Sequence, residues 1–313
     1  MNIRHKYLPN LSDLQENGFL VWPLKSGLGR LAVEAVQDFY DQPLADRAAL
    51  VPDGFDPMGY TPSEAETDDL LAMRSKVPAS FTGQRRRGYA SFDFLATPAS
   101  IAPSGLVGSP MSLGDVGLQR RVAGVTASLR QLASHIAFAL WDAISAEFGA
   151  PGWPRSALSG QTCSITRLLR YRPGELEISK AHTDYEFIAL IISDEPGLEV
   201  RNHRDDWSSV DAPSGCVIVL PGDMMGLATD GAIGASVHRV RCNGRLRHAF
   251  IQFQGLAYQT ALDHPAMTTF GNHLCGMLVR GAPRLAAAHA AGLLPLSFQP
   301  PLHNPVGVKA HVF

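Results

Sequence analysis

The sequence lacks the features that would assign it to a membrane, to an oxidising compartment or to nucleic acid. No stretch of about 18 consecutive apolar residues marks a membrane-spanning helix, and the basic segment 1–6 is not followed by the apolar part of a secretory signal. The four cysteines, Cys163, Cys216, Cys242 and Cys275, form no Cys-x-x-Cys pair, so neither a zinc knuckle nor a disulfide framework is predicted. Charged residues make up 18% of the chain and the formal net charge is −2, which gives no electrostatic reason to expect nucleic acid or a membrane as partner. We therefore expect a cytoplasmic protein that binds a small molecule, with its oligomeric state open.

The sequence does contain a change of pattern along the chain. Residues 18–22 are typical of a short strand, and a helical repeat follows them. Residues 50–112 are rich in Gly, Pro and Ser, which predicts long loops over a functional face. Apolar residues recur every three or four positions between residues 122 and 148, which predicts one long amphipathic helix. From about residue 162 short apolar runs alternate with turn residues, and the pattern is helical again over residues 274–294.

This succession predicts a mainly β fold with flanking helices, built on a double-stranded β-helix, or jelly roll. Many short strands without helices between them favour a barrel over a parallel sheet, and 313 residues suit a single unit of that kind. We expect one domain over residues 1–313. Residues 1–150 would form an N-terminal α/β support with the long helix, residues 160–256 a jelly-roll core with a metal site, and residues 257–313 a C-terminal helical tail.

Three residues of the predicted core have the types and spacing of metal ligands. The triplet His182-Thr183-Asp184 is expected to open a strand, where residues two apart point to the same face, so that imidazole and carboxylate reach one ion. Such a triplet is common by chance and by itself fits a histidine bonded to a carboxylate equally well. His238 follows Asp184 by 54 residues (238 − 184 = 54) and supplies a third ligand. Two histidines and a carboxylate on one face of a metal leave the opposite face open to a co-substrate and O₂, which is the ligand set of non-haem Fe(II).

A guanidinium is expected beside this site. The Asn-Gly pair at residues 243–244 separates two apolar runs and predicts a two-residue hairpin. In that register His238 faces Ala249, so Arg247 lies diagonally beside His238 on the same face. A guanidinium binds a carboxylate through two parallel hydrogen bonds, and an unpaired buried arginine is costly. We therefore expect an anionic ligand or a protein carboxylate to meet Arg247.

Further segments follow the order of one known family. They are Glu16-Asn17-Gly18-Phe19, Phe39-Tyr40-Asp41-Gln42-Pro43-Leu44, Gly59-Tyr60-Thr61-Pro62, Gly197-Leu198-Glu199-Val200, Trp207, Pro221-Gly222-Asp223 and His238-Arg239-Val240. Together with the His182 triplet they resemble the 2-oxoglutarate/Fe(II) dioxygenase superfamily over most of the chain. The resemblance is to its isopenicillin N synthase-like branch, and within that to microbial members such as the ethylene-forming enzyme.

The resemblance implies a role for each residue of the site. His182, Asp184 and His238 would bind iron as the catalytic centre, and Arg247 would pair with the distal carboxylate of 2-oxoglutarate. The family often has Arg-x-Ser at this point, whereas Ala249 stands here in the place of the serine. The charge of Arg247 is retained, and the ethylene-forming branch similarly tolerates alanine.

Residues 167–171 are similar to a family strand that lines the iron pocket. Strand alternation puts Arg167 and Tyr171 on one face, so both are expected as neighbours of the co-substrate. A surface arginine and a packed tyrosine fit the same pattern equally well. Many plant members have asparagine where Leu169 stands.

The activity implied by the resemblance is oxidation of a small molecule with Fe(II), 2-oxoglutarate and O₂, releasing succinate and CO₂, in microbial secondary metabolism. Hydroxylation, desaturation and cyclisation are all compatible with the site, while a carboxylate at Asp184 argues against halogenation, because similar halogenases carry a small residue there. The main alternative is an Fe(II) oxidase of the isopenicillin N synthase type, which uses no 2-oxoglutarate. A zinc hydrolase with the same ligands and a non-catalytic binding protein are further alternatives.

Overall fold

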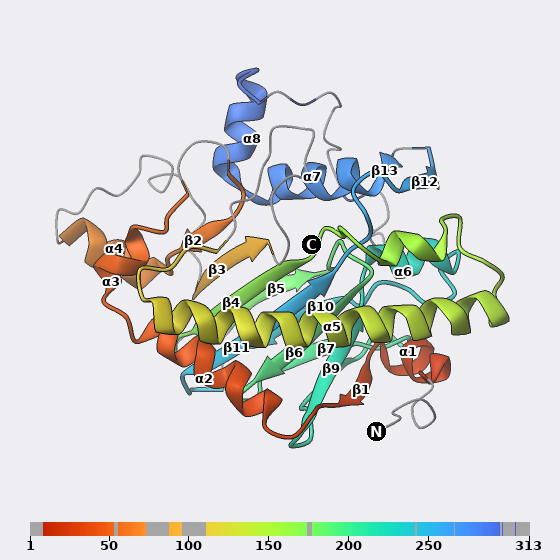
Figure 1. Ribbon diagram of the computed structural model, residues 1–313, viewed down its shortest axis with the longest axis horizontal. Helices are drawn as coiled ribbons and strands as arrows, with labels where there is room; N and C mark the ends of the chain where they lie inside the picture. Colours follow the sequence, from red (N-terminus) through yellow and green to blue (C-terminus); the bar gives the residue numbers. More distant parts are fainter. Residues whose placement is uncertain are drawn as a thin grey trace.

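The computed structural model (Figure 1) describes residues 9–52, 56–72, 88–95, 111–173, 177–241, 243–265, 267–294, 296 and 304. Its helices are α1 (Leu11–Asn17), α2 (Leu28–Tyr40), α3 (Leu44–Ala48), α4 (Glu64–Ala72), α5 (Val116–Glu147), the 3-10 helix η2 (Arg155–Leu158), α6 (Asp223–Ala228), α7 (Phe270–Gly281) and α8 (Pro283–Ala290). Its strands are β1 (Leu20–Pro23), β2 (Gly59–Thr61), β3 (Tyr89–Leu95), β4 (Ile165–Tyr171), β5 (Glu177–His182), β6 (Ile188–Ser193), β7 (Leu198–Arg201), β8 (Trp207–Ser209), β9 (Cys216–Pro221), β10 (His238–Arg241), β11 (Arg247–Gln254), β12 (Ala261–His264) and β13 (Met267–Thr269).

Two antiparallel sheets form the core, which confirms the mainly β prediction. The larger sheet has the strand order β1-β9-β6-β11-β4-β3-β2, and the smaller has the order β5-β10-β7-β8. Strands that follow each other in sequence alternate between the two sheets from β4 to β7, as a jelly roll requires. Side chains from both sheets line one pocket between them.

Helices α2 and α5 cover the outer face of the larger sheet (Figure 1). Residues buried along α5, from Leu118 to Ile144, recur every three or four positions, and the Asp115 side chain accepts a hydrogen bond from the backbone N–H of Leu118 at its start. Because helices cover one face of β11 and the pocket lies on the other, every residue of that strand is buried. Strands β6 and β9 of the same sheet are nearly continuous apolar runs, whereas β11 buries polar side chains such as Gln252 and Gln254 as well. Among the described helices, none is long and apolar enough to cross a membrane.

The stretch 50–112 contains more regular structure than its composition predicts. Strands β2 and β3 extend the larger sheet beyond β4, and α4 lies between them in sequence. The run Arg85-Arg86-Arg87, which sequence reasoning interprets as a solvated surface, lies outside the described residues. The loop prediction is wrong for β3, where Ala90, Phe92 and Phe94 are buried on one face. Gly and Pro in the flanking segments hide this strand when composition is averaged over the whole stretch.

A buried ion cluster joins α3 and α4 to the edge of the larger sheet. Glu66 is fully buried and pairs with Arg170, and at 3.2 Å with Arg47. Burial alone would raise the pKa of Glu66, but the backbone N–H of Ser63 and the two guanidinium groups outweigh it and lower that pKa. Glu66 is therefore a charged link between the N-terminal segment and β4.

Replacing Glu66 with glutamine is expected to destabilise the fold by about 3–5 kcal/mol at neutral pH, because two largely buried guanidinium groups lose their counter-charge. The carboxyl group binds its proton less readily in the folded than in the unfolded chain, so its contribution is present above about pH 4.5 and is lost as pH falls through the lowered pKa. Urea unfolding of both proteins from neutral to acid pH should show the difference shrinking. Glu34→Gln, which removes an exposed pair with Arg30, should change stability by less than about 0.5 kcal/mol. A pH-independent difference would contradict the assignment.

Candidate metal centre and adjoining pocket

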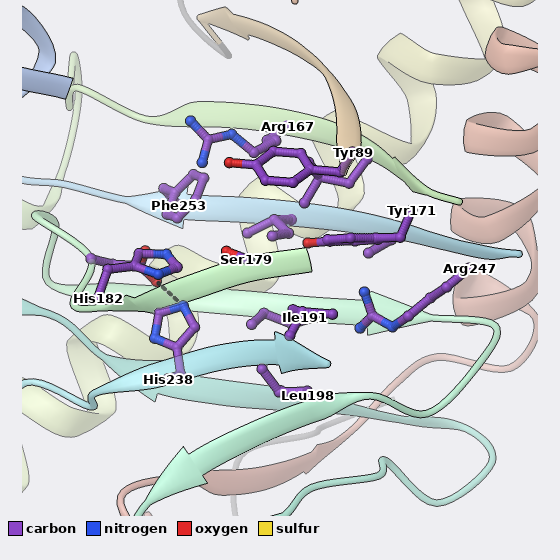
Figure 2. Close-up of a pocket in the computed structure, with 15 residues that line it drawn as sticks. Tyr89, Arg167, Tyr171, Ser179, His182, Ile191, Leu198, His238, Arg247 and Phe253 are labelled. Carbon is purple, nitrogen blue, oxygen red and sulfur yellow. Dashed lines mark ion pairs between the residues drawn. The ribbon is translucent and has the colours of Figure 1, made fainter. Parts of the chain in front are cut away.

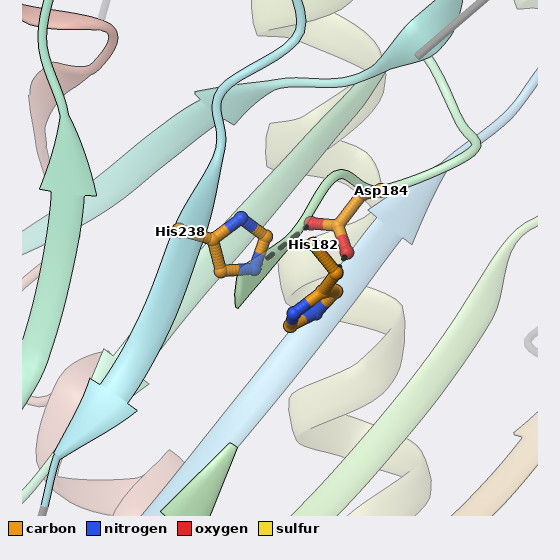
Figure 3. A group of neighbouring side chains, drawn as sticks. All are labelled: His182, Asp184 and His238. Carbon is orange, nitrogen blue, oxygen red and sulfur yellow. Dashed lines mark ion pairs between the residues drawn. The ribbon is translucent and has the colours of Figure 1, made fainter. Parts of the chain in front are cut away.

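His182, Asp184 and His238 converge at one end of the barrel (Figure 3). Each offers one ligand atom, and these atoms all lie within 4.8 Å of one another. The Nε2 atoms of His182 and His238 lie 3.9 and 3.8 Å from the carboxylate oxygens of Asp184. Among the described residues no other His, Cys, Asp or Glu cluster meets this criterion. The predicted triad is therefore brought together.

The local structure of the triplet differs from the prediction. His182 is the last residue of β5, and Asp184 lies in the turn before β6, so the triplet ends a strand and does not open one. His182 is the direct cross-strand partner of His238, the first residue of β10. The imidazoles meet through this pairing, with ring centroids 4.3 Å apart, and the turn then brings the carboxylate back to them.

Hydrogen bonds orient both imidazoles for metal binding. The Nδ1 atom of His182 lies 2.7 Å from the carbonyl oxygen of Lys180, and that of His238 lies 3.0 Å from the carbonyl oxygen of Ser236. A carbonyl only accepts, so each Nδ1 carries the hydrogen and each Nε2 presents a lone pair to the centre. Desolvation and the neighbouring His238 lower the pKa of His182 to about 4. The ring is thus neutral at physiological pH, as metal binding requires.

The turn that carries Asp184 rests on the junction between β9 and α6. The backbone N–H of Asp223 donates to the carbonyl oxygen of Asp184 at 2.8 Å, and that of Gly222 donates to Phe187 at 3.0 Å. A Cβ atom on Gly222 would lie 2.3 Å from the carbonyl oxygen of Glu186 and 3.1 Å from that of Asp184. Only glycine permits this approach.

Gly222→Ala is expected to destabilise the fold by about 2–4 kcal/mol, because backbone atoms rather than a flexible side chain must move. The same movement should displace Asp184 and weaken metal binding. Urea unfolding and Fe(II) retention after desalting measure the two effects. Gly226→Ala, in the helix α6 that begins just after Gly222, is the matched control, since its Cβ would meet nothing closer than 3.6 Å. Equal stability of the two variants would contradict this account.

A pocket extends from the triad along the barrel interior (Figure 2). The pocket is partly open, and about 470 Å³ of empty space, some of it open solvent, lies within it. Its walls are Tyr89, Arg167, Leu169, Tyr171, Ser179, His182, Asp184, Ile191, Leu198, His238, Val240, Arg247, Ala249, Ile251 and Phe253. In Figure 2 the two histidines lie at one end and Arg247 at the other. An elongated ligand that reaches both the metal and Arg247 would fit this arrangement.

Arg247 shares the pocket with His238, but not through the predicted hairpin. Strand β10 pairs with β5 and β7, and β11 pairs with β4 and β6, so the Asn-Gly segment crosses from one sheet to the other. The hairpin prediction is wrong because a local turn signal does not distinguish a hairpin from a connection between facing sheets. Arg247 and His238 instead line the same pocket from opposite sheets, at its two ends.

Arg247 has an unused hydrogen-bonding group. Only 3% of the residue is exposed, its Nε donates to the carbonyl oxygen of Glu195 at 2.9 Å, and its Nη1 has no hydrogen-bond partner among the described residues. The guanidinium lies 4.9 Å from the ring centroid of Tyr171, its direct cross-strand partner. Burial raises the pKa of Tyr171 to about 12, so its hydroxyl remains a donor. A carboxylate would satisfy the buried Nη1.

Arg167 and Tyr171 both line this pocket, on β4. The Nε of Arg167 donates to Asp93 at 2.5 Å and its Nη2 donates to the other oxygen at 3.3 Å. Sequence reasoning missed Asp93 because it lies in the unpredicted strand β3. The alternation Tyr89, Ser91, Asp93 is the signal that would have placed it on the inner face.

Two imidazoles and one carboxylate at the end of an open pocket in a jelly roll define a mononuclear metal site of the non-haem oxygenase kind. The family comparison agrees. Residues 163–253 match the model described as the 2OG-Fe(II) oxygenase superfamily, so this segment is a domain of that superfamily. The superfamily prediction is thereby confirmed, while the isopenicillin N synthase-like branch and the likeness to microbial members stay predictions.

Individual relatives match parts of the chain. It is 40% identical over 63 residues to 2-oxoglutarate-dependent dioxygenase 21 of Oryza sativa, covering 20% of this chain and 19% of that one. It is 29% identical over 129 residues to homoarginine-6-hydroxylase of Glycine max, covering 37% and 39%. The chain thus spans well under half of these curated relatives.

Solved structures match over more of the length. A putative oxygenase from Shewanella oneidensis has a TM-score of 0.62 at 18% identity, covering 91% of this chain and 94% of that one. A full-length Neurospora crassa protein in complex with alpha-KG and thymine has a TM-score of 0.63 at 17% identity, covering 89% of each chain. At such identities the likeness concerns the fold, and it confirms the double-stranded β-helix.

Proposed function

We propose that this protein is an Fe(II)- and 2-oxoglutarate-dependent oxygenase that oxidises a small molecule and releases succinate and CO₂. One observation carries the proposal: Arg247 lines the pocket that begins at the His182, Asp184 and His238 triad, and its buried Nη1 has no partner within the part of the chain that the structure describes. The metal site alone also suits zinc, but a hydrolase has no need of an anion-binding guanidinium farther along the barrel. A role in microbial secondary metabolism and the single-domain organisation stay predictions.

Different residues of the pocket would bind the metal and the co-substrate. His182, Asp184 and His238 would hold the metal on one face and leave the other open. Arg247 and the Tyr171 hydroxyl would fix the distal carboxylate, and through it the orientation of the co-substrate. When bound, Fe(II) and 2-oxoglutarate supply the oxidising power by activating O₂.

The walls would protect the reaction from water. Leu169, Leu198 and Ile251 give the pocket an apolar lining, and Ile191 and Phe253 extend it. A dry, apolar site strengthens the interactions between the co-substrate carboxylates and the fixed charges. Hydroxylation, desaturation and cyclisation share this machinery, and the choice between them depends on how the substrate lies.

The deciding experiment is an anaerobic titration of metal-free protein with Fe(II), then with 2-oxoglutarate. Chelation of Fe(II) by 2-oxoglutarate produces a weak visible charge-transfer band, which we expect to saturate at one equivalent. Iron binding without the band would favour the oxidase that uses no 2-oxoglutarate. Failure to bind Fe(II) would refute the proposal.

A further inference from the structure

We propose that Arg167, held in place by Asp93, binds the carboxylate of the molecule that is oxidised, so that the substrate is a small carboxylic acid. The inference rests on the proposed function, because it assumes that Arg247 is occupied by the co-substrate. It gives the second guanidinium of the pocket, which the sequence predicts only as a neighbour of the co-substrate, a ligand of its own.

Arg167 and Arg247 lie at different positions along the pocket. Arg247 is the cross-strand partner of Tyr171, whereas Arg167 lies four residues earlier on β4, opposite Ile251. Four residues of strand correspond to roughly 13 Å. Figure 2 shows the Arg167 side chain toward the two histidines and the Arg247 side chain at the opposite end of the pocket. The Arg167 guanidinium therefore lies at the end of the pocket nearer the metal ligands, where the substrate must lie. The Arg247 guanidinium lies at the far end (Figure 2).

Asp93 fixes Arg167 from one side and leaves its other edge toward the pocket. Asp93 accepts from Nε and Nη2, which restrains the planar group. About 31% of the Arg167 side chain is exposed, against 13% of the Asp93 side chain, and Arg167 but not Asp93 lines the pocket. Asp93 is thus a positioning residue, and it leaves the Nη1 donors of Arg167 and one of the two at Nη2 for another partner on a side chain that lines the pocket.

The residues around Arg167 favour a carboxylic acid that also has an apolar portion. The Arg167 guanidinium lies 5.4 Å from the ring centroid of Phe253, and Ile251 and Leu169 line the same pocket. A guanidinium is always charged and its fork matches a carboxylate. A molecule with both a carboxylate and an apolar portion would use both features, and it would hold its C–H bonds beside the metal.

The test is calorimetric binding under anaerobic conditions to the complex with Fe(II) and 2-oxoglutarate. The probes are phenylacetate and hexanoate, each compared with its amide of the same shape. We expect at least one acid to bind, about tenfold or more tightly than its amide, since a charge-assisted hydrogen bond is what separates them. Arg167→Met should abolish that preference, Arg167→Lys should restore part of it, and Asp93→Asn should weaken binding of the acid several-fold with little effect on the amide.

Two further measurements separate this inference from the proposed function. The affinity for 2-oxoglutarate, read from the charge-transfer band, should stay within about twofold of wild type in Arg167→Met. Arg155→Gln removes an equally bidentate but exposed pair with Asp142 and should change no affinity. Equal binding of acids and amides, an unchanged preference in Arg167→Met, or no binding of either acid would overturn the inference, while the band would still report on the proposed function.

Discussion

Replacing His238 with alanine is expected to abolish stoichiometric Fe(II) binding, with a loss of affinity of at least about a hundredfold. Removal of groups that only support metal ligands already costs roughly 10–100-fold, and His238 is expected to be a ligand itself. The variant keeps His182 and Asp184, but two donors hold an ion far less well than three on one face. Iron retained per chain after anaerobic loading and desalting measures the effect.

The control for this variant is His203→Ala. His203 is exposed, its Nδ1 lies 2.8 Å from the carbonyl oxygen of Glu16, and it belongs to no metal-binding group. It should therefore retain iron as wild type does. Because His238 is 5% exposed, the melting temperature of both metal-free variants should be recorded, so that a folding defect is recognised. A folded His238→Ala protein that keeps one tightly bound iron would contradict the metal assignment.

The ligand types were predictable from the sequence, but the way they converge was not. Sequence spacing and residue chemistry singled out His182, Asp184 and His238. The expected strand alternation was wrong, because the cross-strand pair His182–His238 and the turn after β5 assemble the site. That turn depends on the approach of Gly222, which lies 38 residues beyond Asp184 (222 − 184 = 38). Contacts between such distant segments leave no local pattern.

Parts of the fold, too, could not be predicted from local sequence patterns. The long helix was predictable because its buried residues follow one period over α5. Strand β3 was missed because it lies within a Gly- and Pro-rich stretch, and Asp93, which lies on it, was missed for the same reason. The chain bends at the Asn-Gly segment, with Gly244 at φ 80°, but the predicted hairpin pairing is wrong, since a local bend does not choose which sheet receives the next strand.

Replacing Arg247 with methionine is expected to raise the dissociation constant for 2-oxoglutarate by about a hundredfold or more while leaving Fe(II) binding intact. Loss of one partner from a buried, hydrogen-bonded charge pair costs about 2–5 kcal/mol, which corresponds to roughly 30- to several thousand-fold in affinity. Methionine preserves much of the bulk and removes the charge. Arg247→Lys should recover only part of the affinity, because an ammonium group lacks the planar fork. Anaerobic titration of the charge-transfer band measures each constant.

Arg245→Met is the matched control, because Arg245 lies two residues earlier, its side chain is 72% exposed and it pairs with Glu195 at 3.3 Å outside the pocket. It should bind 2-oxoglutarate as wild type does. The pattern across variants matters more than any single value. Loss of iron in His238→Ala, combined with loss of only the co-substrate in Arg247→Met, would separate the two ends of the pocket experimentally. An unchanged titration in Arg247→Met would leave the unpartnered Nη1 without its proposed ligand and would favour an oxidase that takes its electrons from the substrate alone.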